Sequence, residues 1–590
     1  MVVGPRGSQR ALASLTRPSS RVLRLALAAL LAAAISHPAL AQHPSMDDDR
    51  TGSVFMPMDS WVYPALERLS TMGLIPSQSV SIRPWTRQEG RRQLREAEDI
   101  LFGFGGMDTH VSKATRSEAE RLLPDLEREL REPDGRATAV LDETYVRIGT
   151  IAGPALTDGF HFGQTWQNDY GRPLGRGTSS IAGYRFRAQA GRFFFANRQE
   201  FQTDPGSPAV SQARADLFNR LDNAPFVIPF INPNIPPEVV IKPQAAQSAY
   251  ARTRPLELYA GMAFAGNELT FGKQEIYWGP TTMGPWSFSR NAEPTYSLRL
   301  VSTRPHPFPL IPNVGSYRFD LVFGKLSGHK SPARPYFNGV KVELAFGDTL
   351  ELGFTRWSLI FGKGHPMTLR NLKNNLFSSV SPNLGEYGDP ADPGDRKSGF
   401  DFRLHVPGLN HLVTVYADGY ADDEVNPVDA PRRVPWAPGI YVARLPKMPH
   451  ADFRFEMASS QELSQDEGGT RFFINNSYRD GNTNKGFLLG NAIGRDARAL
   501  EGRVGYWMSA RTRVEGGYRQ SKISQNFLPG GGTISDGFVE ATYNKGEWTI
   551  GMFAQGERFL VPSYMTGSQS NGSGRLQITW TPHKSEALLP

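Results

Sequence analysis

The sequence contains no cysteine among its 590 residues. Disulfide frameworks, zinc ribbons and thiol chemistry are therefore excluded. It also has no run of about 18 consecutive apolar residues, the length that a membrane-spanning helix requires. Hydrophobic residues make up 39% of the chain, which is low for a bundle of membrane helices. If the chain spans a membrane, it must do so with β-strands.

Sequence motifs of catalysis are also missing. The chain has no His-Glu-x-x-His, no Gly-x-Ser-x-Gly and no glycine-rich phosphate loop between a strand and a helix. His405 and His411 flank a turn at Gly408, and such a pair is either a polar pair on a hydrated strand face or part of a metal site. We favour the polar pair, because a zinc site needs three or four ligands. We expect no enzyme, no catalytic residue, no metal and no cofactor; scattered carboxylates leave a hydrolase as an alternative.

The positive charge of the chain is concentrated at its beginning. The formal net charge is +7, but residues 1–41 carry five arginines and no acid. The remaining chain has 60 basic and 58 acidic side chains, a net charge of +2. A nucleic-acid partner is therefore not expected, because such proteins carry a marked excess of basic residues.

The first 41 residues have the anatomy of a secretory signal peptide. Arg21 and Arg24 precede an apolar run from Leu25 to Ile35, and Ala39-Leu40-Ala41 forms a small-residue cleavage site. The alternative is a single N-terminal anchor helix, which needs a longer apolar core. We predict cleavage after Ala41 and export from the cytoplasm.

Helical periodicity marks residues 47–136, which we predict to be a periplasmic helical bundle. Val62, Leu66, Leu69 and Met72 share one helical face, and Gly73 is placed to end that helix. Two capping boxes predict further helices, one from Thr86 with Glu89 and one from Thr115 with Glu118. Pro124 is expected to kink or interrupt the third helix.

From about Ala139 the period of hydrophobicity changes to 2 and stays there, which indicates β-strands. Two hairpins are clear, with turns at Gly266-Asn267 and Gly347-Asp348. Opposite the apolar residues of 400–406 lie Asp401, Arg403 and His405. A soluble sandwich buries its alternate apolar residues, whereas a membrane barrel turns them to lipid and keeps a polar interior.

Because this pattern repeats over more than 400 residues without a helical segment, we predict a mainly β protein. It consists of a large transmembrane antiparallel β-barrel of about 16–18 strands with a small N-terminal helical bundle. The barrel spans 138–582 and is followed by a C-terminal tail, 583–590. Two long insertions are expected to be loops, the proline-rich residues 222–243 and the polar residues 365–398.

Several short motifs resemble the Wzi-type capsule-assembly proteins in their order along the chain. They are Asp59 to Leu69, Gly73-Leu74-Ile75, Arg83-Pro84-Trp85-Thr86-Arg87, Phe271-Gly272-Lys273-Gln274, Trp278-Gly279-Pro280, Asn291-Ala292-Glu293-Pro294, Tyr478-Arg479-Asp480-Gly481, Lys485-Gly486, Leu489-Gly490 and Ile493 to Asp496. The resemblance covers nearly the whole mature chain. It implies an outer-membrane barrel, in contact with outer-membrane lipid, that binds capsular or other surface polysaccharide and helps hold the capsule on the cell.

Aromatic side chains next to planar polar groups are candidates for sugar binding, because rings cover the apolar faces of sugars and planar groups bond their hydroxyls. Three loop groups qualify: Trp166 and Tyr170 with Asn168 and Asp169; Trp278 and Trp286 with Arg290 and Asn291; and Tyr478 with Arg479 and Asp480. The alternative is that these rings belong to the interfacial girdles of a barrel. Trp278 and Trp286 lie beside Gly279, Pro280, Gly284 and Pro285, and this irregular backbone favours a loop.

Arginines on the hydrated strand faces allow two interpretations. Arg185, Arg187, Arg403 and Arg454 either attract anions into the lumen or brace the wall through acids such as Asp401, Asp452 and Glu456. We favour the bracing role. For the whole chain, the leading hypothesis is polysaccharide binding at the cell surface, and the alternative is an outer-membrane porin or solute channel.

Overall fold

The computed structural model describes most of the predicted mature chain. The described residues are 51–103, 111–133, 137–222, 241–312, 314–377, 394–406, 408–409, 412–422, 428, 434–461, 469–475 and 477–582. The predicted signal peptide, most of the proline-rich insertion and the predicted tail 583–590 lie outside these residues.

Three helices stand at the start of the described chain, as the periodicity predicts. They are α2 (Val62–Thr71), α3 (Arg87–Phe102) and α4 (Lys113–Leu130). The Thr86 hydroxyl accepts a hydrogen bond from the Glu89 backbone N–H at 3.1 Å, which confirms the first predicted cap. The second was wrong: Ser112 caps α4 by accepting from the Thr115 N–H at 3.1 Å, so this helix begins earlier. Pro124 lies inside α4 without interrupting it.

Eighteen long antiparallel strands form one closed barrel within the described residues, which confirms the predicted fold class. They are β2 (Ala137–Ile151), β5 (Gly177–Ala190), β6 (Phe193–Asp204), β7 (Tyr250–Phe264), β8 (Asn267–Gln274), β10 (Thr295–Ser302), β12 (Ser316–Lys325), β13 (Tyr336–Phe346), β14 (Leu350–Ile360), β15 (Asp395–His405), β16 (Val413–Ala421), β17 (Trp436–Val442), β18 (Ala451–Ser459), β21 (Ala497–Trp507), β22 (Arg513–Ile523), β23 (Gly532–Lys545), β24 (Trp548–Leu560) and β25 (Gln569–Trp580).

Each of these strands pairs with its neighbours along the chain, and β2 pairs with β25 to close the barrel. Short two-residue strands complete the set: β11 (His306–Pro307) extends the barrel beside β12, while the others pair outside its wall. These others are β1 (Ile82–Arg83) with β9 (Tyr277–Trp278), β3 (Thr157–Asp158) with β4 (Gly163–Gln164), and β19 (Thr483–Asn484) with β20 (Phe487–Leu488).

The two faces of the wall have the polarity of a membrane barrel. Apolar side chains such as Ile148 and Phe271 are exposed on the outside, Phe271 by 68%. The alternate residues face inward and are charged, and Asp320, Lys341 and Asp401 are completely buried. A sandwich would show the reverse, with apolar residues buried between two sheets. The period-2 pattern therefore describes an apolar exterior and a polar interior, the arrangement of transmembrane barrels.

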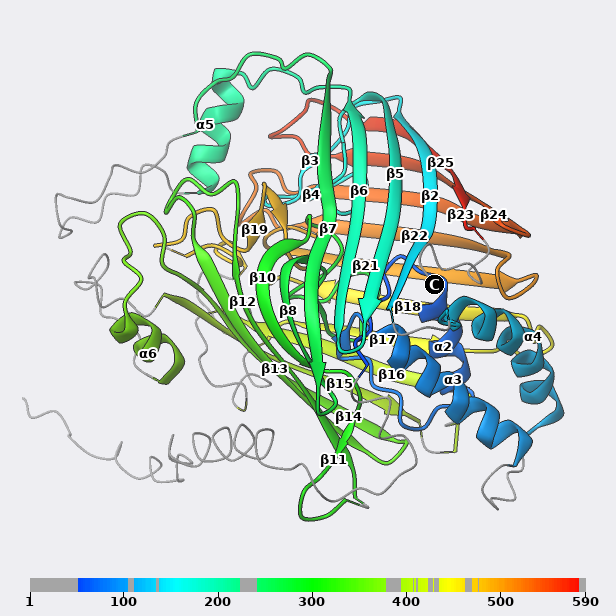
Figure 1. The fold of residues 1–590 in the computed structure, drawn as a ribbon. Coiled ribbons are helices and arrows are strands. Elements are labelled where there is room, and N and C mark those ends of the chain that lie inside the picture. The colour runs from blue at the N-terminus through cyan, green and yellow to red at the C-terminus, as the bar shows by residue number, and fades with distance from the viewer. Residues whose placement is uncertain are drawn as a thin grey trace, which may run out of the picture.

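The two ends of the barrel differ. Short turns such as 191–192 and 265–266 lie at one end, and long connections such as 152–176, 275–294 and 460–496 lie at the other. The three N-terminal helices pack at the short-turn end, where their core includes Ala443, Trp507 and Ala510 of the barrel (Figure 1). Among the described residues, no helix combines the length and apolar character needed to cross a membrane.

Two of the long connections contain helices, contrary to the expectation of a helix-free region after Ala139. Helix α5 (Gln212–Leu221) lies between β6 and β7, and α6 (Leu369–Phe377) lies inside the predicted polar loop 365–398. The hydroxyl of Ser211 caps α5 by accepting from the Arg214 N–H at 3.3 Å. Polar composition predicts exposure to solvent, and it does not prevent a capped segment from forming a local helix.

Candidate functional site

The N-terminal segment before α2 and the connection between α2 and α3 run inside the barrel, where carboxylates of the wall and of the loop that follows β8 hold them. The backbone N–H of Ser53 donates to Glu268 at 3.0 Å, that of Met58 to Glu275 at 2.9 Å, and that of Val80 to Glu351 at 3.1 Å. In addition, β1 pairs with β9 of the 275–294 loop. The chain that leads into the helices is therefore part of the filling of the lumen.

The 275–294 loop folds inward and forms the centre of a plug. Trp278 and Trp286 are almost completely buried, and the Trp278 Nε1 donates to Asp320 of β12 at 2.7 Å. The backbone N–H of Trp286 donates to Asp418 of β16 at 2.6 Å. Hydrogen bonds from two strands of the wall thus fix this loop, and the two indole rings pack among buried Phe and Leu side chains.

Two further loops complete the plug. From the 152–176 loop, Gln164 Nε2 donates to the Asn291 side-chain oxygen at 2.7 Å. From the 460–496 loop, the Leu488 carbonyl accepts from Asn291 Nδ2 at 3.0 Å, and Asn491 Nδ2 donates to the Gly284 carbonyl at 2.7 Å. Asn291 is fully buried and joins all three loops.

The structure separates the predicted sugar-binding residues into an inner and an outer set. The inner set consists of Trp166, Tyr170, Trp278, Trp286, Arg290 and Asn291, with Asn168 and Asp169 beside them. Its members meet inside the lumen: the Tyr170 N–H donates to the Arg290 carbonyl at 2.6 Å. The outer set consists of Arg479 and Asp480, which are half-buried, and their neighbour Tyr478, which is 1% exposed and packs in the same apolar cluster as Trp278 and Trp286.

None of the four inner aromatic rings, those of Trp166, Tyr170, Trp278 and Trp286, faces the lipid-exposed girdles. They belong to the plug or to the space beside it, and each is at most 4% exposed. Their sugar-binding role stays a prediction. Sequence reasoning detected that these aromatic residues stand in irregular loops, and it missed that the loops turn inward.

A polar cavity of about 530 Å³ lies next to the plug. It is lined by the N-terminal segment around Asp59, by the 152–176 loop, by Arg290 and by the inner face of β21 to β25. Thirteen arginines and eight carboxylates line it. Eight of these arginines were not predicted from the sequence: Arg147, Arg172, Arg198, Arg503, Arg511, Arg513, Arg519 and Arg575. The signal for the six that lie in strands, all but Arg172 and Arg511, is an arginine on the hydrated face of a strand.

Several arginines of the wall brace it through ion pairs. Arg187 contacts Asp142 at 2.9 Å, Arg403 pairs with Glu351, and Lys341 pairs with Asp401. Arg454 bonds Glu67 of α2 at 2.8 Å, and the predicted partner Glu456 lies 3.8 Å away. These contacts fit the bracing interpretation for Arg187, Arg403 and Arg454.

Within the described residues, no three His, Asp or Glu side chains gather as a metal site. His405 lies inside the barrel, where its Nδ1 is 3.2 Å from the Thr414 hydroxyl. His411 lies outside the described residues.

Comparison with known families identifies the chain. A family model described as capsule assembly protein Wzi matches residues 147–572, which is more than two thirds of the sequence. The chain belongs to the Wzi capsule-assembly family. No curated protein sequence matches it significantly.

The solved structure of Wzi from Escherichia coli has the same fold as this Wzi-family chain. Wzi of Escherichia coli, described as an outer-membrane, carbohydrate-binding β-barrel involved in group 1 capsule assembly, is 15% identical with a TM-score of 0.60. The match covers 89% of this chain and 99% of that one. The Pseudomonas aeruginosa proteins OprD and OpdQ are 8% and 9% identical, with TM-scores of 0.40 and 0.38. Those matches cover 77% and 76% of this chain, and 96% and 99% of theirs.

The loops of this Wzi-family chain are also joined by a buried histidine. His161 Nδ1 lies 2.7 Å from Asp158, and its Nε2 lies 3.1 Å from Asp222 at the end of α5. Asp222 also binds Arg495 at 2.9 Å. Burial by itself lowers the pKa of His161, but the two carboxylates outweigh it and raise the pKa to about 9. The charged imidazolium therefore connects three loops at neutral pH.

We expect this histidine to make the loop end less stable in alkali. Its folded pKa of about 9 exceeds its usual value of 6.5, so its stabilisation is complete below pH 6.5 and is lost as the pH rises through 9. The midpoint of thermal unfolding in detergent should fall between pH 6.5 and pH 9.5, and less so in His161→Gln. Equal falls in the two proteins would show that other groups cause the loss.

Proposed function

We propose that this chain binds surface polysaccharide at the loop end of an outer-membrane barrel and takes part in assembling or attaching capsule. The observation that carries the proposal is the buried plug, in which three long loops fill the lumen around Asn291. A lumen filled in this way suits a binding protein better than a solute channel. Family membership supplies the class of ligand, and Wzi of E. coli is described as carbohydrate-binding.

The proposed orientation puts the helices in the periplasm. Outer-membrane barrels have short periplasmic turns and longer external loops. Helices α2 to α4 pack at the end with short turns, and the 152–176, 275–294 and 460–496 loops lie at the opposite end. The exposed apolar side chains of the wall then contact outer-membrane lipid.

The outer set of residues is the proposed contact surface for polysaccharide. Asp480 accepts the backbone N–H groups of Lys330 and Ser331, each at 2.8 Å, and the Arg479 N–H donates to the Ser331 carbonyl at 2.9 Å. These bonds fix the Asp480 carboxylate and the Arg479 backbone, and the Arg479 guanidinium donates to the Asp222 carbonyl, so both side chains stand on a rigid loop junction. A guanidinium and a carboxylate held in this way present directed donors and acceptors to sugar hydroxyls. The inner set then has the role of holding the loops in place.

The proposal is tested with polysaccharide extracted from the surface of the source strain. The purified protein should bind it in solution without shortening it, since no catalytic activity is proposed. A strain that lacks the protein should release polysaccharide into the medium while total synthesis stays unchanged. In planar bilayers the protein should form no stable open pores. Absence of binding together with normal retention would overturn the proposal, and stable pores would favour the channel alternative.

A single-residue variant examines the proposed surface. Arg479→Gln removes a charged donor and should weaken polysaccharide binding about tenfold, because hydrogen bonds to charged groups are the stronger ones. Arg131→Gln is the matched control, since Arg131 is exposed next to α4 at the opposite end of the barrel. Equal affinities of the two variants would exclude Arg479 from the contact surface.

A further inference from the structure

The cavity beside the plug carries an excess of positive charge. Of its lining residues, thirteen are arginines and eight are Asp or Glu, a formal excess of five positive charges. Several arginines share one acid: Asp169 contacts Arg172 at 3.1 Å and Arg575 at 3.3 Å, and it also pairs with Arg147. An excess of charge focused inside a low-dielectric wall attracts ions of opposite sign.

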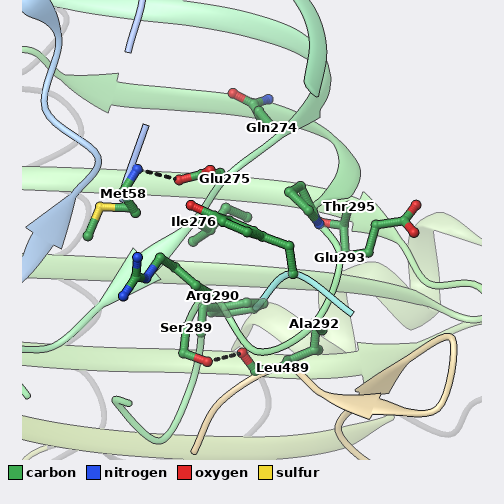
Figure 2. A pocket seen from close by; sticks show the side chains of 13 residues that line it. Met58, Gln274, Glu275, Ile276, Ser289, Arg290, Ala292, Glu293, Thr295 and Leu489 are labelled. Carbon is green, nitrogen blue, oxygen red and sulfur yellow. Dashed lines mark hydrogen bonds between the residues drawn. The ribbon is translucent and has the colours of Figure 1, made fainter. Parts of the chain in front are cut away.

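Four of these arginines form no ion pair within the described residues: Arg83, Arg185, Arg290 and Arg511. Arg83 and Arg185 donate instead to the carbonyls of Gly279 and Phe55. Among the described residues, no carboxylate lies within 4.0 Å of the guanidinium of Arg290 or Arg511, and Arg290 also makes no side-chain hydrogen bond. Figure 2 shows the Arg290 guanidinium directed away from Glu293 and Thr295, on the side of Met58. Burial lowers the pKa of Arg290, but Tyr170, Tyr277, Asp59 and Glu275 outweigh it from beyond ion-pair distance and raise the pKa, so the guanidinium is charged.

A buried hydroxyl without a partner lies at the same place. Tyr170 is 2% exposed, and among the described residues its hydroxyl has no hydrogen-bond partner. Tyr170 lines the cavity together with Arg290, and the guanidinium of Arg172 lies 5.2 Å from its ring. A buried hydroxyl without a protein partner is available to bond a molecule that enters the cavity.

The cavity runs from the middle of the barrel to its helix-bearing end. Tyr170 and Arg290 line its inner part, while Trp61, Arg511 and Thr581 line it at the short-turn end. Arg511 lies 5.9 Å from the Trp61 ring, so an arginine and an aromatic face stand together there. A volume of about 530 Å³ lies within the range of small-ligand sites.

We infer that this cavity is a second saccharide site that takes a short acidic sugar chain, one with carboxylate groups, from the helix-bearing end of the barrel. Arg511 and Trp61 contact the chain at the entrance. Arg290 and the Tyr170 hydroxyl bind a carboxylate at the inner end, where aromatic side chains provide flat surfaces for sugar rings. The class of ligand rests on the proposed function, whereas the location does not.

The test measures binding by calorimetry on the detergent-solubilised full chain. Trigalacturonate is the acidic trisaccharide, and maltotriose is the neutral trisaccharide for comparison. Trigalacturonate should bind with an affinity that falls as salt rises, and maltotriose should bind at least tenfold more weakly. Arg290→Gln and Arg511→Gln should each weaken trigalacturonate binding about tenfold, while Arg290→Lys should retain part of it. Arg131→Gln should bind like the wild type. Sodium acetate serves as a third arm that reports binding of a lone carboxylate.

Three outcomes would overturn the inference. They are equal binding of the neutral and acidic trisaccharides, unchanged binding in both glutamine variants, and binding of acetate as tight as that of trigalacturonate, which would show a simple anion site. Failure of the proposed function looks different, because the wild type would then not bind the extracted surface polysaccharide at all. Intact cells separate the two sites further, since only the loop end is accessible to added polysaccharide.

Discussion

Arg68→Ala is expected to detach the helical bundle from the barrel. Arg68 is completely buried in α2 and bonds Glu118 of α4 at 3.0 Å, the Pro449 carbonyl at 2.7 Å and, at 3.5 Å, Asp452 of β18. Removing the guanidinium takes one cation away from two buried carboxylates, which keep Arg121 at 2.8 Å and Arg513 at 3.0 Å, so the cost should fall below the roughly 3–5 kcal/mol of a fully unpaired buried charge. Hydrogen exchange across α2 and α3 should become markedly faster, and the midpoint of thermal unfolding should fall.

The matched control for this prediction is Arg128→Ala. Arg128 lies on α4 with its side chain 70% exposed and pairs only with Asp125 of the same helix. Such exposed pairs contribute little, so this variant should exchange like the wild type. If Arg68→Ala left exchange in the helices unchanged, the docking of the bundle would depend on its apolar contacts and on other polar contacts such as Arg454 with Glu67.

Trp286→Ala is expected to loosen the plug. The Trp286 ring packs between Phe472 and Phe473 of another loop, with ring centroids 5.4 and 6.1 Å away. Its Nε1 has no hydrogen-bond partner among the described residues, so the loss is one of packing. A buried Trp→Ala change costs about 3–5 kcal/mol. Added protease should cut the 460–496 loop faster, and transient ion conductance should appear in planar bilayers where the wild type is closed.

Trp548→Ala provides the comparison for the plug. Trp548 begins β24 and is 54% exposed, so its removal leaves the lumen intact. Trp286→Phe, which keeps an aromatic ring, should lie between the wild type and the alanine variant. Unchanged protease cutting in Trp286→Ala would mean that the hydrogen bonds around Asn291 hold the loops without the indole.

Local features of the chain predicted the secondary structure well. The hydroxyl of Thr86 stands before a helical pattern, and it caps α3 because only adjacent residues are involved. The hairpin turn at Gly347 connects β13 and β14 as expected, since a glycine with φ of 59° fits the turn. The cap of α4 was predicted at the wrong residue because Ser112 and Thr115 both carry a hydroxyl that can accept a backbone N–H. Which of the two is the cap depends on where the helix starts.

The functional residues were harder to predict because their surroundings come from distant segments. Trp278 and Trp286 were correctly expected in irregular loops. Their burial depends on Asp320 and Asp418, which belong to strands far along the chain. A sequence without its fold does not reveal whether a loop points outward or into the lumen.

The sequence by itself determined the kind of wall that the chain builds. Apolar residues at every second position, with charges between them, have one stable arrangement in lipid, a closed barrel with a polar interior. Only the tertiary structure decided what fills that interior. Arg403 pairs with a carboxylate of the neighbouring strand, whereas Arg290 forms no ion pair within the described residues. Such pairing depends on distances between segments that are far apart in the sequence, and the local pattern carries no information about those distances.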